Sequence, residues 1–145
     1  MTRSDREYPD RPWVGVGVVV WQGDRVLLIQ RGKPPRMGQW GIPGGAQTVG
    51  ETLFQAATRE VLEETGLTVE PKAVITALDS IHHDADGQTQ FHYTLVEVLA
   101  ECPAGDPIAA DDALDARWMT LDQVADIVEW GETLRVIELS SALRV

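Results

Sequence analysis

Three glutamates stand at positions 60, 63 and 64, inside the segment Thr52 to Thr65, which contains no glycine or proline. On an α-helix these spacings bring the three carboxylates within an arc of roughly 100°. Like charges at such spacings destabilise a helix by roughly 0.2 to 0.5 kcal/mol per pair, and by more where they are partly desolvated. Arg59 can pair with Glu63, but one guanidinium cannot balance three carboxylates, so we expect a cation nearby.

A divalent cation is the natural counterion for this cluster, because Mg²⁺ is usually held by a few carboxylates together with phosphates and water. The turn Pro43-Gly44-Gly45 precedes the helix, and glycines let the backbone approach a ligand closely. The Gly44 or Gly45 carbonyl could therefore add a metal ligand or a phosphate contact. The sequence predicts a site for Mg²⁺ or Mn²⁺, and the competing interpretation is a solvated acidic helix face.

The helix that carries the glutamates is expected over Thr52 to Thr65. Thr48 stands three residues before Glu51, as in a capping box, and Gly66 stands where a left-handed cap would end the helix. Its buried side is expected to hold four apolar residues that are related by steps of three, four and seven: Phe54, Ala57, Val61 and Leu62.

The segments around this helix favour β-structure. Apolar, β-branched runs predict five strands: Trp13 to Trp21, Val26 to Gln30, Val69 to Ile81, Gln88 to Glu101 and Ala116 to Met119. Residues 31 to 50 hold three prolines and six glycines, which predicts an ordered loop with a short strand around Trp40. A second loop is expected over Pro103 to Asp112.

The order of the elements predicts the fold class. Asp84 to Gly87 favours a tight turn between the third and fourth strands, which makes them a hairpin. Two more helices are expected at the end of the chain, near Leu121 to Val128 and Gly131 to Ala142. Strands interrupted by one helix and followed by others indicate a mixed sheet with helices on both faces, in the α/β or α+β class.

Length and composition favour one globular domain over residues 1–145, with about residues 1–11 as a flexible N-terminus. Twelve Lys and Arg against 23 Asp and Glu give a net charge of -11, which opposes binding to a nucleic-acid polymer. No apolar run approaches the roughly 18 residues of a membrane-spanning helix. The single cysteine, Cys102, cannot form an internal disulfide. We expect a cytoplasmic monomer or homodimer that binds no membrane.

From Gly45 the chain reads GAQTVGETLFQAATREVLEETGL. Glu51 stands six positions after Gly45, the pair Arg59-Glu60 begins eight positions further on, and aliphatic Val61 precedes Glu63-Glu64-Thr65-Gly66-Leu67. This 23-residue segment resembles the Nudix box at every defined position. GQWGIPGG before it, the early strand pair and the RWM segment at Trp118 are similar to further landmarks of the Nudix family.

The resemblance implies a Nudix-type α/β/α sandwich with a mixed β-sheet. It also implies Mg²⁺ or Mn²⁺ as cofactor and attack by water on a phosphorus of a nucleoside diphosphate derivative. By resemblance, Glu60 and Glu64 are the core metal ligands, which Glu63 and Glu51 assist. The carbonyl of Gly44 or Gly45 would complete the metal shell.

The resemblance leaves the general base open, because this role falls to a box glutamate or to an acid on a distant loop. Glu63, Glu60 and Arg59 are the expected catalytic residues of the box, with Arg59 orienting a glutamate. Asp112 stands six residues before Trp118, where some members place the distant acid. Its neighbours Asp111 and Asp106 could do the same, and the competing interpretation is that all three are solvated loop acids.

Candidate substrate contacts lie outside the box. Arg31, Lys33 and Arg36 could meet phosphates that the metal leaves uncovered, or form a solvated loop. Trp40 could stack on a base or belong to the core. His82 and His92 could reach the site from the hairpin, and too few ligands accompany them for a zinc site.

The substrate expected by resemblance is a small-molecule nucleotide, first ADP-ribose or a similar nucleotide sugar and second a (d)NTP. A hypothesis of another class is a catalytically silent Nudix module that binds a nucleotide as an effector. Such modules usually lack box glutamates, and here all of them are present. A purely structural acidic domain, without metal dependence, is the remaining alternative.

Overall fold

A mixed β-sheet lies at the centre of the computed structural model, which describes residues 6–144. Within that part of the chain the sheet has seven strands. Five of them follow the order β3-β2-β1-β6-β5, β4 pairs with β1, and β7 pairs with β2. Strands β1 and β6 run parallel, and the other pairs are antiparallel. The bounds of the strands are β1 Trp13–Gln22, β2 Arg25–Arg31, β3 Trp40–Gly41, β4 Gly44–Ala46, β5 Glu70–His83, β6 Thr89–Glu101 and β7 Ala113–Thr120.

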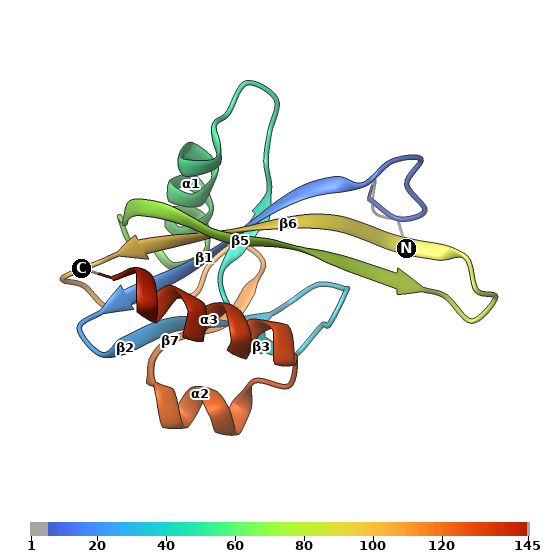
Figure 1. The fold of residues 1–145 in the computed structure, drawn as a ribbon. Coiled ribbons are helices and arrows are strands. Elements are labelled where there is room, and N and C mark those ends of the chain that lie inside the picture. Colours follow the sequence, from blue (N-terminus) through green and yellow to red (C-terminus); the bar gives the residue numbers. More distant parts are fainter. Residues whose placement is uncertain (1–5, 145) are drawn as a thin grey trace.

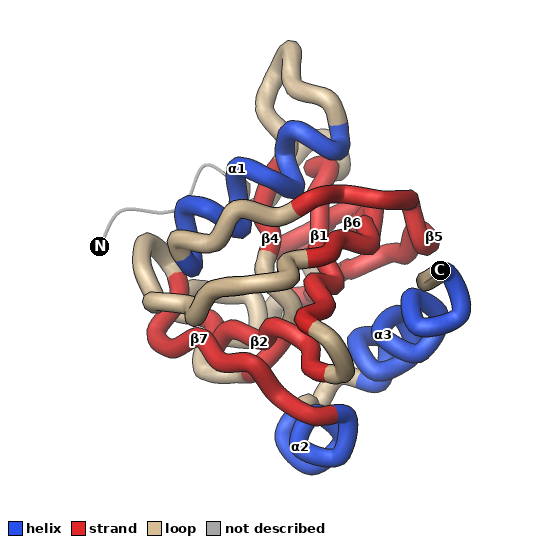
Figure 2. Tube along the Cα trace, turned by 90° about the vertical axis from the view of Figure 1, so that its left-hand side faces the viewer, coloured by secondary structure: helices blue, strands red, loops and turns tan. Residues whose placement is uncertain are grey.

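Helices cover both faces of the sheet (Figures 1 and 2). Helix α1 (Leu53–Thr65) packs on one face, and α2 (Leu121–Ile127) and α3 (Gly131–Leu143) lie on the other. Alternation along β1 divides the core accordingly, because Val18 and Val20 belong to the cluster under α1 whereas Val19 belongs to the cluster under α3. This arrangement confirms the predicted α/β/α sandwich with a mixed sheet.

The capping of α1 differs in part from the sequence prediction. The capping box is formed by Thr52 and Gln55, each of whose side chains accepts a hydrogen bond from the other's backbone N–H. Thr48 and Glu51, expected in that role, instead bond to each other in the turn before the helix. Gly66 closes the helix with φ 74°, as predicted.

The expected apolar face of α1 is wrong in part. Phe54 is 39% exposed and Leu62 is 49% exposed, whereas Ala57, Val61 and Glu64 are buried. The helix is therefore rotated so that Glu64 faces the sheet and does not merely flank the buried side. Small side chains at Ala56 and Ala57 allow α1 to lie close to β1 and β4.

The glycine-rich segment 31–50 contains one strand more than predicted. The expected strand at Trp40 is present as β3, but Gly44 to Ala46 forms β4 along the first half of β1. Because β4 occupies that edge, β1 and β2 pair only next to their turn, at Trp21 with Val26 and Gln22 with Arg25. The hairpin of β5 and β6 is confirmed, with Gly87 at φ 81°.

The expected flexible N-terminus, about residues 1–11, lies partly outside the described residues. Within them, the Tyr8 N–H donates to the Gln90 carbonyl, and the Tyr8 hydroxyl donates to Asp84 Oδ2 over 2.8 Å. Along residues 6–144, no helix has the length and apolar character needed to cross a membrane.

Candidate active site

Arg59 on α1 connects three of the acidic side chains. Its Nε donates to Glu51 Oε2 over 2.6 Å, and one terminal nitrogen donates to Glu60 Oε1 over 2.8 Å and to Glu63 Oε2 over 3.2 Å. The other terminal nitrogen donates to the Ala46 carbonyl on β4 and to Glu51. Hydrogen bonds from Arg59 are the main cause that lowers the pKa of Glu51 to about 2. Arg59 therefore fixes the acidic helix to the loop and to β4.

Glu64 occupies the most enclosed position of the cluster. Its side chain is buried, and Oε1 accepts a hydrogen bond from the Gly44 N–H over 2.9 Å. Burial raises the pKa of Glu64 to about 8, and the charge of Glu60 adds to the rise. The site thus holds a carboxylate whose charge the protein compensates only in part.

Glu60 lies directly against the backbone of β4. A Cβ added at Gly45 would stand 2.5 Å from the Glu60 carboxylate carbon, so any larger residue would displace this carboxylate. Burial also raises the pKa of Glu60, against the opposing effect of Arg59. The glycines of β4 therefore give both Glu60 and Glu64 their close approach to the backbone.

The donor set fits a hard divalent cation. Carboxylate oxygens of Glu60 and Glu64 lie beside the peptide groups of Gly44 and Gly45, and oxygen ligands are those that Mg²⁺ and Mn²⁺ prefer. Arg59 engages Glu51 and Glu63 and one oxygen of Glu60, so that of these glutamates only Glu64 has no bond to it in the described residues. No three His, Cys, Asp or Glu side chains of residues 6–144 enclose a ready-made metal site. A cation here would thus take two carboxylates and rely on backbone, water or phosphate oxygens for the rest.

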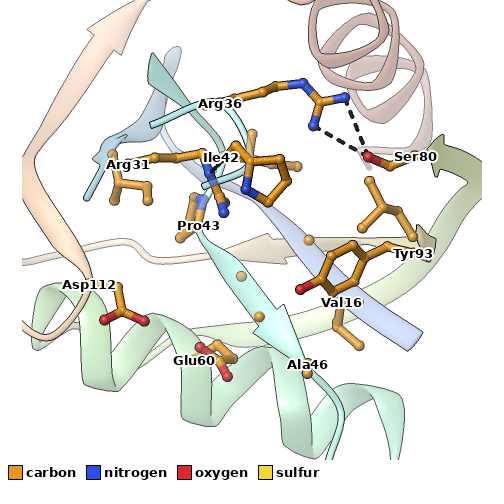
Figure 3. Close-up of a pocket in the computed structure, with 18 of the residues that line it drawn as sticks. Val16, Arg31, Arg36, Ile42, Pro43, Ala46, Glu60, Ser80, Tyr93 and Asp112 are labelled. Atoms are coloured by element: carbon orange, nitrogen blue, oxygen red, sulfur yellow. Dashed lines mark hydrogen bonds between the residues drawn. The ribbon is translucent and has the colours of Figure 1, made fainter. Parts of the chain in front are cut away.

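A cavity of about 700 Å³ opens beside these glutamates. Figure 3 shows Arg31 and Arg36 on one side of it and Glu60 on the other. The charged end of the cavity also includes Asp111 and Asp112, whereas Asp106 does not line it. The part of the cavity under α3 is lined by apolar side chains, among them Leu78, Leu95 and Val136, and also by polar ones, namely Arg36, Ser80, Glu132 and Thr133.

The comparison with known protein families covers the part of the chain that carries this site. The family model described as NUDIX domain matches residues 11–138, which include every residue of this acidic network. The chain belongs to the Nudix family.

Named relatives of this Nudix chain differ in their substrates. An ADP-ribose pyrophosphatase of Methanocaldococcus jannaschii is 31% identical over 113 residues, which are 78% of this chain and 64% of that protein. An oxidized purine nucleoside triphosphate hydrolase of Danio rerio is 32% identical over 120 residues, 81% of this chain and 72% of that protein. The chain thus spans somewhat less than two thirds of the archaeal relative.

The fold of the Nudix chain is also that of a solved structure with a ligand. The NUDIX domain of Shewanella oneidensis NrtR complexed with ADP ribose superposes with a TM-score of 0.73 at 23% identity, covering 93% of this chain and 90% of that one. At this level of identity the likeness concerns the fold.

The three cations expected from the sequence have different surroundings. Arg31 lines the cavity, donates to the Pro35 carbonyl over 2.8 Å and is attracted by Glu64 and Asp112. Lys33 forms a 2.9 Å ion pair with Asp112 at the exposed rim. Arg36 lies 3.6 Å from the Trp130 ring centroid. Burial is the main cause that lowers the pKa of Arg31 and of Arg36.

The aromatic and imidazole side chains that the sequence suggested as substrate contacts differ in where they lie relative to the cavity. Trp40 lines the cavity but also packs on the core beneath α3, and Arg117 lies 5.4 Å from its ring centroid. His92 is absent from the described residues that line the cavity, because its neighbours Phe91 and Tyr93 occupy that face of β6. His82 accompanies Ser80, which bonds to Arg36.

Glu97 on β6 is a cavity residue that the sequence reading did not find. Its side chain is buried, and burial alone raises its pKa to about 7. Its presence could have been noticed as a single acid inside the apolar run TLVEVLA, two residues from Leu95 and Leu99 and therefore on their face of the strand. Tyr93 and Trp130 also line the cavity, and no pattern in the sequence indicated this position for them.

Proposed function

We propose that this chain hydrolyses a phosphoanhydride bond of a nucleoside diphosphate derivative with the help of Mg²⁺ or Mn²⁺. The observation that carries the proposal is the pair Glu60 and Glu64, two carboxyls with raised pKa values against the glycine backbone of β4, at the charged end of a nucleotide-sized cavity. Two relatives of the chain, one named as a pyrophosphatase and one as a triphosphate hydrolase, support it.

The roles of the residues follow from their contacts. Glu60 and Glu64 would hold the cation, together with a carbonyl of Gly44 or Gly45. When bound, the cation supplies charge neutralisation for the phosphates and a more acidic water. Arg59 keeps Glu60 in place through its 2.8 Å bond, and the same guanidinium holds Glu63 and Glu51.

The proton of the attacking water needs an acceptor, and two candidates remain from the cavity residues. Glu63 lies half-exposed at the mouth, and Asp112 lies across from it on the loop before β7, paired with Lys33. Each is engaged by a cation, Glu63 by Arg59 over 3.2 Å and Asp112 by Lys33 over 2.9 Å, so both stay candidates for the general base. Arg31, which Glu64 and Asp112 attract, would bind a phosphate oxygen of the substrate.

For the substrate we keep two classes. ADP-ribose and similar nucleotide sugars agree with the name of the archaeal relative. Nucleoside triphosphates agree with the name of the zebrafish relative. Among them, the Glu97 carboxyl group on the floor of the cavity favours those whose base is a purine with adjacent N–H groups. A silent effector module is disfavoured, because Glu60, Glu63 and Glu64 are all in place.

The proposal also covers the cellular location, the oligomeric state and the partners of the protein. We infer a cytoplasmic protein, acting as a monomer or homodimer on a small-molecule nucleotide without a nucleic-acid polymer. The net charge of -11 supports the last point, since it repels a polyphosphate backbone.

The test is release of phosphate or of a phosphatase-labile product from ADP-ribose, nucleotide sugars, dinucleoside polyphosphates and (d)NTPs, with Mg²⁺, with Mn²⁺ and with EDTA. Turnover of one class that EDTA abolishes supports the proposal. Turnover that EDTA leaves unchanged contradicts the metal dependence. Silence across the panel, with nucleotide binding intact by calorimetry, would make the chain an effector module.

A further inference from the structure

Glu97 stands at the centre of β6, opposite Gly17 on β1 in the parallel ladder. A Cβ at Gly17 would overlap Glu97 Oε2 and would stand 3.0 Å from Ile42 Cδ1. The carboxyl group thus lies flat over a glycine, on the face of the sheet that α3 covers. The absence of a side chain at position 17 creates the space that it fills.

Within residues 6–144, the burial of the Glu97 carboxyl group leaves one of its oxygens without a hydrogen-bond partner, and no charged group contributes to its pKa. The side chain is 4% exposed, and Oε2 is buried without any hydrogen-bond partner in the described part of the chain. A buried acceptor left unpaired costs about 1 to 3 kcal/mol, and more when it is charged. Desolvation is also the sole cause of its raised pKa. A group that costs stability in the free protein is expected to have a partner in the complex.

The cavity relates Glu97 to the substrate. The same cavity is lined by Glu60 and Glu64 at one end and, around Glu97, by Leu78, Leu95 and Val136. A nucleotide has a charged end and a flat, largely apolar base, so its phosphates fit the metal end and its base fits the apolar end. The edge of the base then meets the Glu97 carboxyl group at the floor, and a rotation of that group would bring Oε2, which is buried against Gly17 in the free protein, toward the base.

A carboxylate offers two acceptor oxygens in one plane and no donor. Guanine carries two adjacent donors, the ring N1–H and the exocyclic N2–H, which match such a pair. Adenine presents one donor beside the lone pair of N1, which would face a carboxylate oxygen. We propose that Glu97 is a specificity-determining residue that accepts hydrogen bonds from the N1–H and N2–H of a guanine-type base, and so selects against adenine.

This inference rests on the proposed function and selects within its two substrate classes by the base, so that it favours guanine nucleotides in both and disfavours ADP-ribose, an adenine nucleotide. The experiment compares kcat and KM for pairs of substrates that differ only in the base: dGTP with dATP, and GDP-glucose with ADP-glucose, at saturating Mg²⁺. The wild type should favour guanine at least tenfold in kcat/KM, mainly through KM, since a bidentate pair is worth roughly ten- to hundredfold in discrimination.

Glu97→Gln replaces one acceptor with a donor, so it should reduce the guanine preference by roughly ten- to hundredfold and raise the relative rate on adenine substrates. Glu97→Asp keeps two acceptors and should retain part of the preference. Gly17→Ala, which occupies the space of the carboxyl group without removing it, should act in the same direction as Glu97→Gln. Glu101→Gln, four residues along the same strand and outside the cavity, is the matched control and should leave the preference unchanged.

A wild type that shows no guanine preference would overturn the inference, as would a Glu97→Gln variant that slows all four substrates equally. If no substrate is turned over, the proposed hydrolysis fails, but base selection is still decided by calorimetry with GMP and AMP. Tighter binding of GMP that Glu97→Gln abolishes would support it, and equal affinities would refute it.

Discussion

Two buried glutamates line the same cavity, and their surroundings differ. Glu64 is 3% exposed and Glu97 is 4% exposed. Glu64 accepts a hydrogen bond from Gly44 and lies among charges, namely Glu60, Arg31 and Asp112. Glu97 has an unpaired oxygen and no charged group that affects its pKa.

The comparison separates two uses of a buried carboxyl group. Around Glu64 the protein gathers two further carboxylates, Glu60 and Asp112, whose charge Arg31 and the Gly44 N–H offset only in part, an environment that a cation would complete. Around Glu97, among the described residues, no charged group contributes to the pKa and one carboxyl oxygen is unpaired, an environment that neutral N–H donors would complete without bringing in a charge. Burial alone therefore indicates a site, and the neighbours of the buried group indicate the chemistry of its ligand.

The largest effect expected from breaking this contrast is that of Glu64→Gln. The neutral amide is a poor ligand for Mg²⁺, so kcat should fall on the order of a thousandfold. The variant should remain folded and, in EDTA, become more stable than the wild type, because the uncompensated buried charge is gone. Turnover and urea unfolding measure the two effects. Activity equal to that of the wild type at saturating Mg²⁺ would remove Glu64 from the metal site.

Glu97→Gln should show a smaller effect, on stability. The pKa of Glu97 is raised from 4.5 to about 7, so its favourable contribution is full below pH 4.5 and is lost as the pH rises through about 7. The free energy of unfolding of the wild type should therefore fall relative to that of Glu97→Gln across this window, by on the order of 3 kcal/mol.

The measurement is urea unfolding in EDTA at several pH values between 4.5 and 8, with Glu129→Gln, at an exposed position of the loop before α3, as the control. Parallel curves for the wild type and Glu97→Gln would mean that the Glu97 carboxyl group is solvated. Added Mg²⁺ should leave this difference unchanged, whereas it should reduce the difference between the wild type and Glu64→Gln. That contrast distinguishes the cation-binding glutamate from the base-binding one.

The metal end of the cavity could be predicted from the sequence, because one continuous helix carries it. Spacing along a helix fixes which side chains share a face, so the sequence could predict that Glu60, Glu64 and Arg59 lie close together, and their roles at a metal stay a prediction. The rotation of the helix about its axis was not predictable. It depends on packing of alanines against β4, and β4 itself is a glycine-rich segment without strand propensity that forms through pairing with β1.

The base end could not be predicted, because strands far apart in the sequence build it. Glu97 meets Gly17 only through the parallel pairing of β1 and β6, which no local pattern encodes. His92 was expected at the site and Tyr93 was not, although they are adjacent. A shift of one residue along a strand reverses the face, and the sequence alone does not say which face lines a cavity.

The smallest effect concerns the glycine backbone that supports only the metal end. Gly45→Ala would place a Cβ against the Glu60 carboxylate, whereas a Cβ at Gly131, at the start of α3 and outside the cavity lining, meets nothing within 4 Å. Displacement of Glu60 should lower kcat about tenfold and raise the Mg²⁺ concentration needed for half-maximal rate, since small misplacements of catalytic groups cost one or two orders of magnitude.

Gly131→Ala should leave both quantities within about twofold of the wild type, because open space surrounds that position and it does not line the cavity. Neither variant touches Glu97, so the base preference should persist in both. If Gly45→Ala changed the base preference as strongly as it changed the need for Mg²⁺, the two ends of the cavity would act as one unit. The proposal that Glu64 binds the cation and Glu97 independently binds the base would then be wrong.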